Sequence, residues 1–91
     1  MKSVKDIEAD LRDIVTSLGL SGAQTSVELS ESGKWLHIVI SCNEFERMSY
    51  GERENMIWKK FEEKFDDDTI LSITQCYLLS PKEYEEALQK S

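Results

Sequence analysis

Two short apolar stretches, separated by the turn 31–33, constrain the fold of this chain more than any other feature. Residues 24–30 (QTSVELS) alternate between apolar or β-branched and polar side chains, as a strand with one buried face does. Residues 34–41 (KWLHIVIS) are apolar almost throughout, which is typical of a central strand covered on both faces. Because Gly33 tolerates a positive φ in the turn, the two stretches predict a β-hairpin.

Three other segments carry helical signals. Residues 4–18 repeat apolar side chains at intervals of three and four, which places them on one stripe of an amphipathic helix. Ser49 with Glu52, and Ser80 with Glu83, have the capping-box spacing that starts a helix. We therefore predict a helix before the hairpin, a second helix after it, and a short third helix that closes the chain.

The third strand is predicted over residues 69–78, where Ile70, Leu71 and Ile73 begin an apolar run. The acidic run 66–68 precedes it and is expected to be a turn in solvent, because acids are unfavourable at a helix C-terminus. A strand–helix–strand crossover after a hairpin gives a mixed sheet. The prediction is a single α+β domain over residues 1–91, ordered α-β-β-α-β-α, with a three-stranded mixed sheet and helices on one side.

Charge and composition narrow the classes of function. The chain has 18 acidic and 11 basic residues, a net charge of −7, which disfavours nucleic acid as a partner because that affinity depends on Lys and Arg. No apolar run approaches the roughly 20 residues of a membrane helix, and the acidic, amphipathic N-terminus is no secretory signal. We expect a cytoplasmic protein that does not contact membranes.

Three motifs share one register from the central strand to the last helix. Ser41 and Phe45 follow the central strand, Arg53 comes eight residues after Phe45 and precedes Met56-Ile57-Trp58, and the last helix opens with Ser80-Pro81-Lys82-Glu83-Tyr84. In these motifs the chain resembles the BolA family. The resemblance implies a class II KH-like fold and a non-enzymatic regulatory module that binds a protein partner, for which a monothiol glutaredoxin is the candidate.

Members of that family share a [2Fe-2S] cluster with the glutaredoxin through a histidine near the start of the third strand. Ser72 occupies the corresponding position here, and the loop 29–34, where the family has its second ligand, contains neither Cys nor His. A serine hydroxyl is a poor substitute for imidazole or thiolate at iron. We therefore expect no cofactor of the chain's own, with a cluster only if a partner shares it. Ser72→His is predicted to create or strengthen such sharing.

The resemblance also suggests where a partner docks. The candidate surface is the former ligand region with two residues that the fold should bring near it: Ser72, Thr74, Cys76, Arg53 and Tyr84. The alternative is a KH-like nucleic-acid-binding domain whose contact loop contains Arg47, Gly51 and Arg53. No nucleophile–base set or phosphate loop can be assembled from the sequence, so an enzyme is not predicted.

The cysteines, the histidine and the aromatic residues leave alternatives open. Cys42 and Cys76 are expected to be reduced, buried thiols, with metal ligation or redox sensing as alternatives and with adjacency across the sheet left open. His37 is expected to be a structural or surface residue, the alternatives being a metal ligand or a pH sensor. The larger aromatic residues are expected mostly in the core, although they could instead form an exposed patch for a partner: Trp35, Trp58, Tyr77 and Tyr84.

Overall fold

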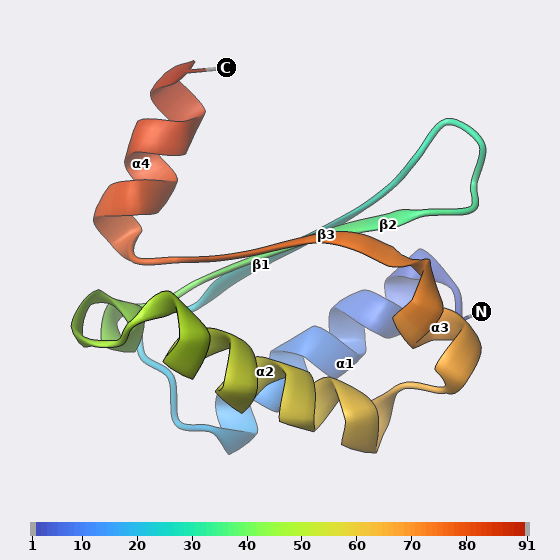
Figure 1. The fold of residues 1–91 in the computed structure, drawn as a ribbon, viewed down its shortest axis with the longest axis horizontal. Coiled ribbons are helices and arrows are strands. Elements are labelled where there is room, and N and C mark those ends of the chain that lie inside the picture. Colours follow the sequence, from blue (N-terminus) through green and yellow to red (C-terminus); the bar gives the residue numbers. More distant parts are fainter. Residues whose placement is uncertain (1, 91) are drawn as a thin grey trace.

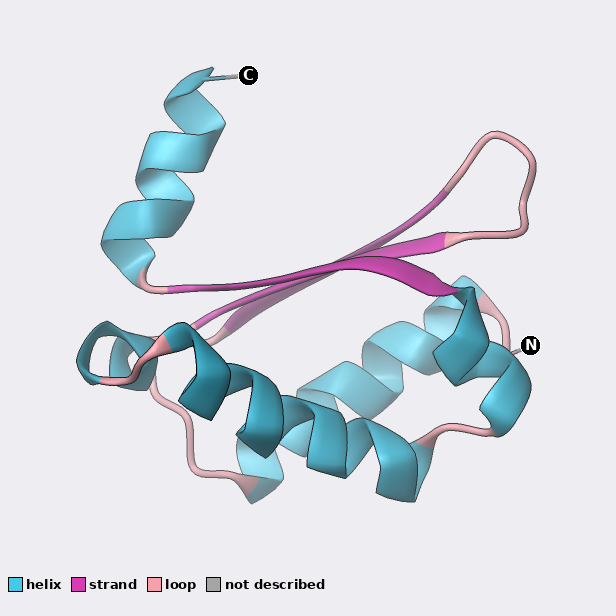
Figure 2. Cartoon of the chain, in the orientation of Figure 1, coloured by secondary structure: helices cyan, strands magenta, loops and turns pink. Residues whose placement is uncertain are grey.

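The computed structural model describes residues 2–90, so Met1 and Ser91, the two ends of the predicted domain, lie outside the described residues. Figure 1 shows the order of the elements and Figure 2 separates helices, strands and loops. In chain order the elements are α1 (Val4–Ser17), β1 (Gln24–Leu29), β2 (Leu36–Ser41), the 3-10 helix η1 (Asn43–Arg47), α2 (Tyr50–Lys64), α3 (Asp67–Ser72), β3 (Ile73–Leu79) and α4 (Pro81–Lys90).

The three strands form one mixed sheet in the order β1-β2-β3. β2 is antiparallel to β1 and parallel to β3. Gly33, in the turn between β1 and β2, has a φ of 74°, a conformation that glycine adopts without steric cost. The predicted α+β arrangement with a hairpin and a crossover to a parallel strand is confirmed.

The inner face of the sheet, which α1 and α2 cover (Figure 1), forms the core. β2 contributes Leu36, Ile38 and Ile40, each with no exposed surface. The helices add side chains that are equally inaccessible to water: Ile7 and Leu11 from α1, and Ile57 and Phe61 from α2. Alternation along β2 and β3 therefore places one side of each of these strands in the core, and β1 adds the partly buried Val27.

The predicted helix starts are also confirmed. The Ser3 hydroxyl accepts a hydrogen bond from the Asp6 backbone N–H at 3.2 Å. At α2, Ser49 and Glu52 make both bonds of a capping box, of 3.2 and 2.9 Å. These local bonds satisfy N–H groups that have no partner within the helix itself.

The acidic run and the start of the third strand differ from the prediction. Asp66 is the N-cap of α3 and accepts a hydrogen bond from the Thr69 N–H at 2.9 Å. Asp67 and Asp68 occupy the first turn of this helix, where carboxylates are favourable. The predicted strand over 69–78 is therefore wrong in its first residues: α3 occupies 67–72, and β3 begins at Ile73.

The last helix lies apart from the others, so the prediction that the helices pack on one side of the sheet is wrong for α4. Figure 1 shows α1, α2 and α3 on one side of the sheet and α4 rising on the other side from the end of β3. The outer face of the sheet, on α4's side, consists of alternate residues of the three strands: Gln24, Ser26, Glu28, His37, Val39, Ser41, Gln75, Tyr77 and Leu79. On this face the central-strand residues His37 and Val39 are only half-buried, so the expectation that both faces of β2 are covered is wrong.

Candidate functional site

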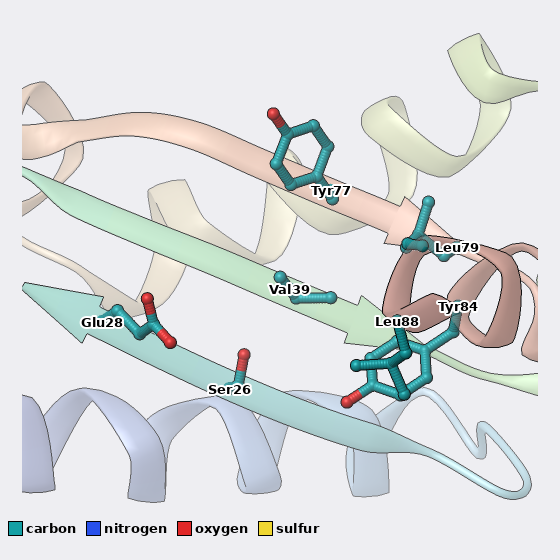
Figure 3. Close-up of a pocket in the computed structure, with 8 residues that line it drawn as sticks. Ser26, Glu28, Val39, Tyr77, Leu79, Tyr84 and Leu88 are labelled. Carbon is teal, nitrogen blue, oxygen red and sulfur yellow. The ribbon is translucent and has the colours of Figure 1, made fainter. Parts of the chain in front are cut away.

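A groove lies where α4 meets the outer face of the sheet. It encloses about 460 Å³ and is lined by Ser26, Glu28, Val39, Tyr77, Leu79, Tyr84, Ala87 and Leu88. Figure 3 shows Tyr84, Leu88 and Leu79 at the end where the strands approach α4, with Glu28 towards the opposite end. The lining is mainly apolar with a few polar groups, which is the usual composition of a binding site.

The floor of the groove comes from the strand register. Ser26 pairs with Val39, and Val39 pairs with Tyr77, so these three side chains form one row across the sheet. Tyr77 keeps 47% of its surface exposed. Because successive side chains on a strand point to opposite faces, the buried neighbour Leu78 lies in the core while Tyr77 remains accessible on the outer face.

The wall of the groove comes from one face of α4. Tyr84, Ala87 and Leu88 are three and four residues apart and therefore lie on the same side of the helix. Leu88 is 59% exposed. An apolar stripe that a helix leaves so exposed is unusual, because such stripes normally pack against the protein's own core.

Arg53 fixes the start of α4. Its guanidinium donates to the carbonyl of Leu78 at 2.9 Å, to the Glu83 carboxylate at 2.7 Å and to the carbonyl of Met48 at 3.2 Å. The same guanidinium lies 5.5 Å from the centre of the Phe45 ring. With only 6% of its surface exposed, Arg53 holds α2, β3 and α4 together from inside, and it does not offer its charge to a partner.

Glu83 completes this junction. Its carboxylate accepts from the Ser80 N–H at 2.7 Å, and the Ser80 hydroxyl accepts from the Glu83 N–H at 3.3 Å. The bond from the Ser80 N–H, followed by the bond from Arg53, lowers the pKa of Glu83 below its ordinary value of 4.5. The capping box predicted at Ser80 and Glu83 is confirmed, and Arg53 ties it to the rest of the fold.

The predicted docking residues do not form one cluster. Ser72 ends α3 and its hydroxyl donates to the carbonyl of Asp68 at 2.8 Å. Thr74, which lies at an irregularity in the pairing of β2 and β3, donates to the carbonyl of Leu36 at 3.4 Å. Cys76 packs against the core on the inner face. Of the predicted set, Tyr84 alone lines the groove.

The two cysteines are not neighbours. Cys76 pairs with Ile38, four residues before Cys42, which directly follows β2; four residues correspond to about 13 Å of extended chain. Both thiols are free, and Cys42 has no exposed surface. Burial raises the pKa of Cys76 to about 12 and also raises the pKa of Cys42, so both side chains are neutral thiols at pH 7.

These residues do not fit an iron–sulfur cluster. Cluster irons are held mainly by thiolate or imidazole groups that can reach them, whereas Ser72 offers a hydroxyl that is bonded to Asp68, Cys42 has no exposed surface and Cys76 packs against the core. Among residues 2–90 no group of three or more His, Cys, Asp or Glu side chains could hold a metal ion. His37 lies half-buried on the outer face, opposite Glu28.

The stretch proposed as a nucleic-acid loop is folded. Arg47 ends η1, and Gly51 lies in the first turn of α2, between Ser49 and Glu52 of the capping box. The neighbouring Tyr50 hydroxyl donates to the carbonyl of Cys76 at 3.1 Å. Since Arg53 is buried, Arg47 is the single exposed basic side chain of the three residues proposed for this loop.

The sequence interpretation missed most of the groove. Trp35 and Tyr77, expected mainly in the core, are 46% and 47% exposed, while Trp58 and Tyr84 are half-buried. Two signals could have found the groove: the alternation of Tyr77 and Leu79 with the buried positions of β3, and the stripe on α4. Neither signal shows by itself that α4 stands on the outer face.

A scan against protein-family models and a search of curated proteins found no match to this chain. None of the helices within residues 2–90 is both long enough and apolar enough to cross a membrane.

Proposed function

We propose that this chain is a non-enzymatic, BolA-like protein-binding module whose partner surface is the groove between α4 and the outer face of the sheet. The observation that carries the proposal is the exposure of Tyr77 and Leu88 in a mainly apolar groove. Removing such surface from water contributes about 25 cal/mol for each Å² of apolar area, from which the entropic and desolvation costs of association are subtracted. A monothiol glutaredoxin is the candidate partner that the sequence resemblance implies.

The chemistry of the lining supports binding rather than catalysis. Glu28 alone among the residues that line the groove carries a charge at neutral pH, and the polar hydroxyl of Ser26 lies on the same strand. Nucleophilic catalysis needs a nucleophile within hydrogen-bond reach of a base. No hydrogen bond joins Ser26 to Glu28, and the two side chains lie two residues apart along β1.

The rigid attachment of α4 also supports a binding role. Arg53 and the capping box of Ser80 and Glu83 fix the first turn of α4 relative to β3. A preformed groove loses less conformational entropy on binding than one that must assemble, so more of the contact energy appears as affinity. The first turn of α4, which carries Tyr84 of the groove wall, is therefore in place before any partner arrives.

The test is a titration of the 15N-labelled chain with a monothiol glutaredoxin, without and with its cluster, followed by NMR. We expect the largest amide shift changes at Val39, Tyr77 and Leu79 and along α4. Tyr77→Ser should weaken binding about tenfold, as expected for an aromatic residue central to an interface. Leu71→Ser is the matched control, because Leu71 is 75% exposed on α3, away from the groove.

Three results would contradict the proposal. Shifts confined to η1 and the start of α2 would place the binding surface at the stretch that contains Arg47 and Gly51, and not at the groove. Equal effects of Tyr77→Ser and Leu71→Ser would mean that the groove is not the contact. The absence of any shift would exclude glutaredoxin as the partner.

A further inference from the structure

We infer that the segment entering the groove is an amphipathic helix of the partner, with Lys or Arg beside its apolar stripe. This inference rests on the proposed function, because it takes the groove as the binding surface and names the chemistry that fits it. Three features of the groove carry it: the hydrogen bonding of the floor, its length, and the charges around it.

The hydrogen bonding of the floor favours a helix over an extended segment. β2, in the middle of the floor, is bonded on both sides to β1 and β3. On the free edge of β3, the carbonyls of Cys76 and Leu78 already accept from Tyr50 and Arg53. An extended peptide lying on the floor would leave its own backbone groups without partners, whereas a helix satisfies them internally.

The size of the floor suggests the length of that helix. Strands of six and seven residues such as β2 and β3 are about 20–23 Å long. A helix of about 14 residues spans the same length at 1.5 Å per residue. On the inner face, α1 and α2 have 14 and 15 residues, so a partner helix of similar length would complete the outer layer.

The negative charges around the groove favour basic residues on the flanks of the partner helix. Glu28 lines the groove on β1, and Glu85 lies next to Tyr84 along α4 and is exposed. Neither forms an ion pair with another described residue. Of the other ionisable groups nearby, Glu83 is paired with Arg53, and His37 lies opposite Glu28 in the strand pairing.

The same negative charges argue against three other occupants of the groove: a second copy of this chain, a nucleic acid and an anionic lipid surface. A second copy of this chain would bring the same two glutamates and a net charge of −7 to the interface, and like charges placed across an interface oppose association. A nucleic acid or an anionic lipid surface meets the same repulsion. A helix with basic flanks gains from both glutamates while its apolar stripe covers Tyr77 and Leu88.

The test uses synthetic 14-residue helical peptides and the full chain, with affinity measured by calorimetry and the contact mapped by NMR. One peptide has a leucine stripe with Lys flanks, a second has the same stripe with Glu flanks, and a third has the Lys peptide's composition in scrambled order. We expect the Lys-flanked peptide to bind at least about fivefold more tightly than either of the others, since rim ion pairs contribute modestly.

Two matched charge reversals, one in the groove and one outside it, test whether the charge preference arises in the groove. Glu28→Lys should weaken the Lys-flanked peptide about five- to tenfold and strengthen the Glu-flanked one, because it replaces an attraction with a repulsion. Glu62→Lys changes the net charge by the same amount on the exposed face of α2, and should change either affinity by less than about twofold.

Other outcomes overturn the inference. Equal affinities for the two flank types, or equal effects of Glu28→Lys and Glu62→Lys, would exclude charge selection by the groove. Groove shifts that depend on the chain's own concentration would make a second copy the occupant. If no peptide binds while a protein partner still shifts the groove amides, this inference fails and the proposed function stands. If the partner shifts amides elsewhere, the proposed function fails.

Discussion

On the inner face of the sheet, Ile38 and Ile40 are completely buried beneath two helices, whereas on the outer face Tyr77 leaves 47% of its surface in water. Both faces belong to the same strands and both carry apolar side chains. The inner face uses them to stabilise the fold, and the outer face keeps them accessible beside α4. Alternation along the strands allows one small sheet to carry a buried apolar face and an accessible apolar face.

The largest expected effect is a difference in the free energy of unfolding between substitutions on the two faces of the sheet. Phe61→Ala on the inner face should lower the free energy of unfolding by about 3–5 kcal/mol, because it leaves a cavity in the core. Tyr77→Ala on the outer face should cost less than about 1 kcal/mol. Urea denaturation of both variants measures the difference. Similar losses would mean that the outer face is part of the core and the comparison is mistaken.

The next prediction concerns Arg53, which connects the core to α4. Arg53→Met should cost about 1.5–3 kcal/mol, because it removes charged hydrogen bonds to the buried carbonyl of Leu78 and to Glu83. Relative to the unmodified chain, Arg53→Met should accelerate amide hydrogen exchange in α4 more than in α1. Lys60→Met is the control, since Lys60 is on the same helix and pairs with Glu63 at the surface. Unchanged exchange in α4 would mean that Arg53 does not hold this helix.

A smaller effect should appear at low pH. The pKa of Glu83 is lowered in the folded chain by the Ser80 N–H and by Arg53, so its stabilising contribution is present above about pH 4.5 and is lost as the pH falls through the lower, folded value. Unfolding measured between pH 6 and pH 2.5 should therefore show a shallower decline for Glu83→Gln than for the unmodified chain.

Glu86→Gln, an exposed change on the same helix, is the control and should follow the unmodified chain. Glu44, Glu52 and Asp66 also have lowered pKa values because their carboxylates accept hydrogen bonds. Their contributions remain in both variants, so the difference isolates Glu83. If the free energy of unfolding declined equally with pH in the unmodified chain, Glu83→Gln and Glu86→Gln, the charge of Glu83 would not stabilise the junction with Arg53.

The last and smallest predicted effect concerns the rate at which the two cysteine thiols react with thiol reagents. Burial raises the pKa of Cys76 to about 12, and only a thiolate reacts readily with alkylating or disulfide reagents. At pH 8 both native thiols should react at least about tenfold more slowly than a thiol introduced on the outer face by Ser26→Cys. Ellman's reagent measures the rates, and unfolding in urea should abolish the difference. Fast labelling of Cys76 in the native chain would place it on an accessible surface.

Local patterns were enough to predict most of the secondary structure. The alternation in residues 24–30, the glycine at position 33 and the serine caps at positions 49 and 80 act within a few residues of the chain. The caps correspond to hydrogen bonds, and the glycine to a positive φ, that the structure contains. The misplaced start of β3 shows the limit of this reasoning. Ile70, Leu71 and Ile73 suit a strand locally, but the cap at Asp66 starts a helical turn first.

The sequence by itself determined most of the helices and strands, though not the short helix α3, and it determined that a hairpin and a crossover form a mixed sheet, because these follow from periodicity and capping. Only the tertiary structure decided that α4 stands on the outer face, that Arg53 is buried and that Tyr77 and Leu88 border one groove. The physical reason is distance along the chain. Arg53 meets Leu78 and Glu83 across 25 and 30 residues, and such contacts depend on how whole elements pack.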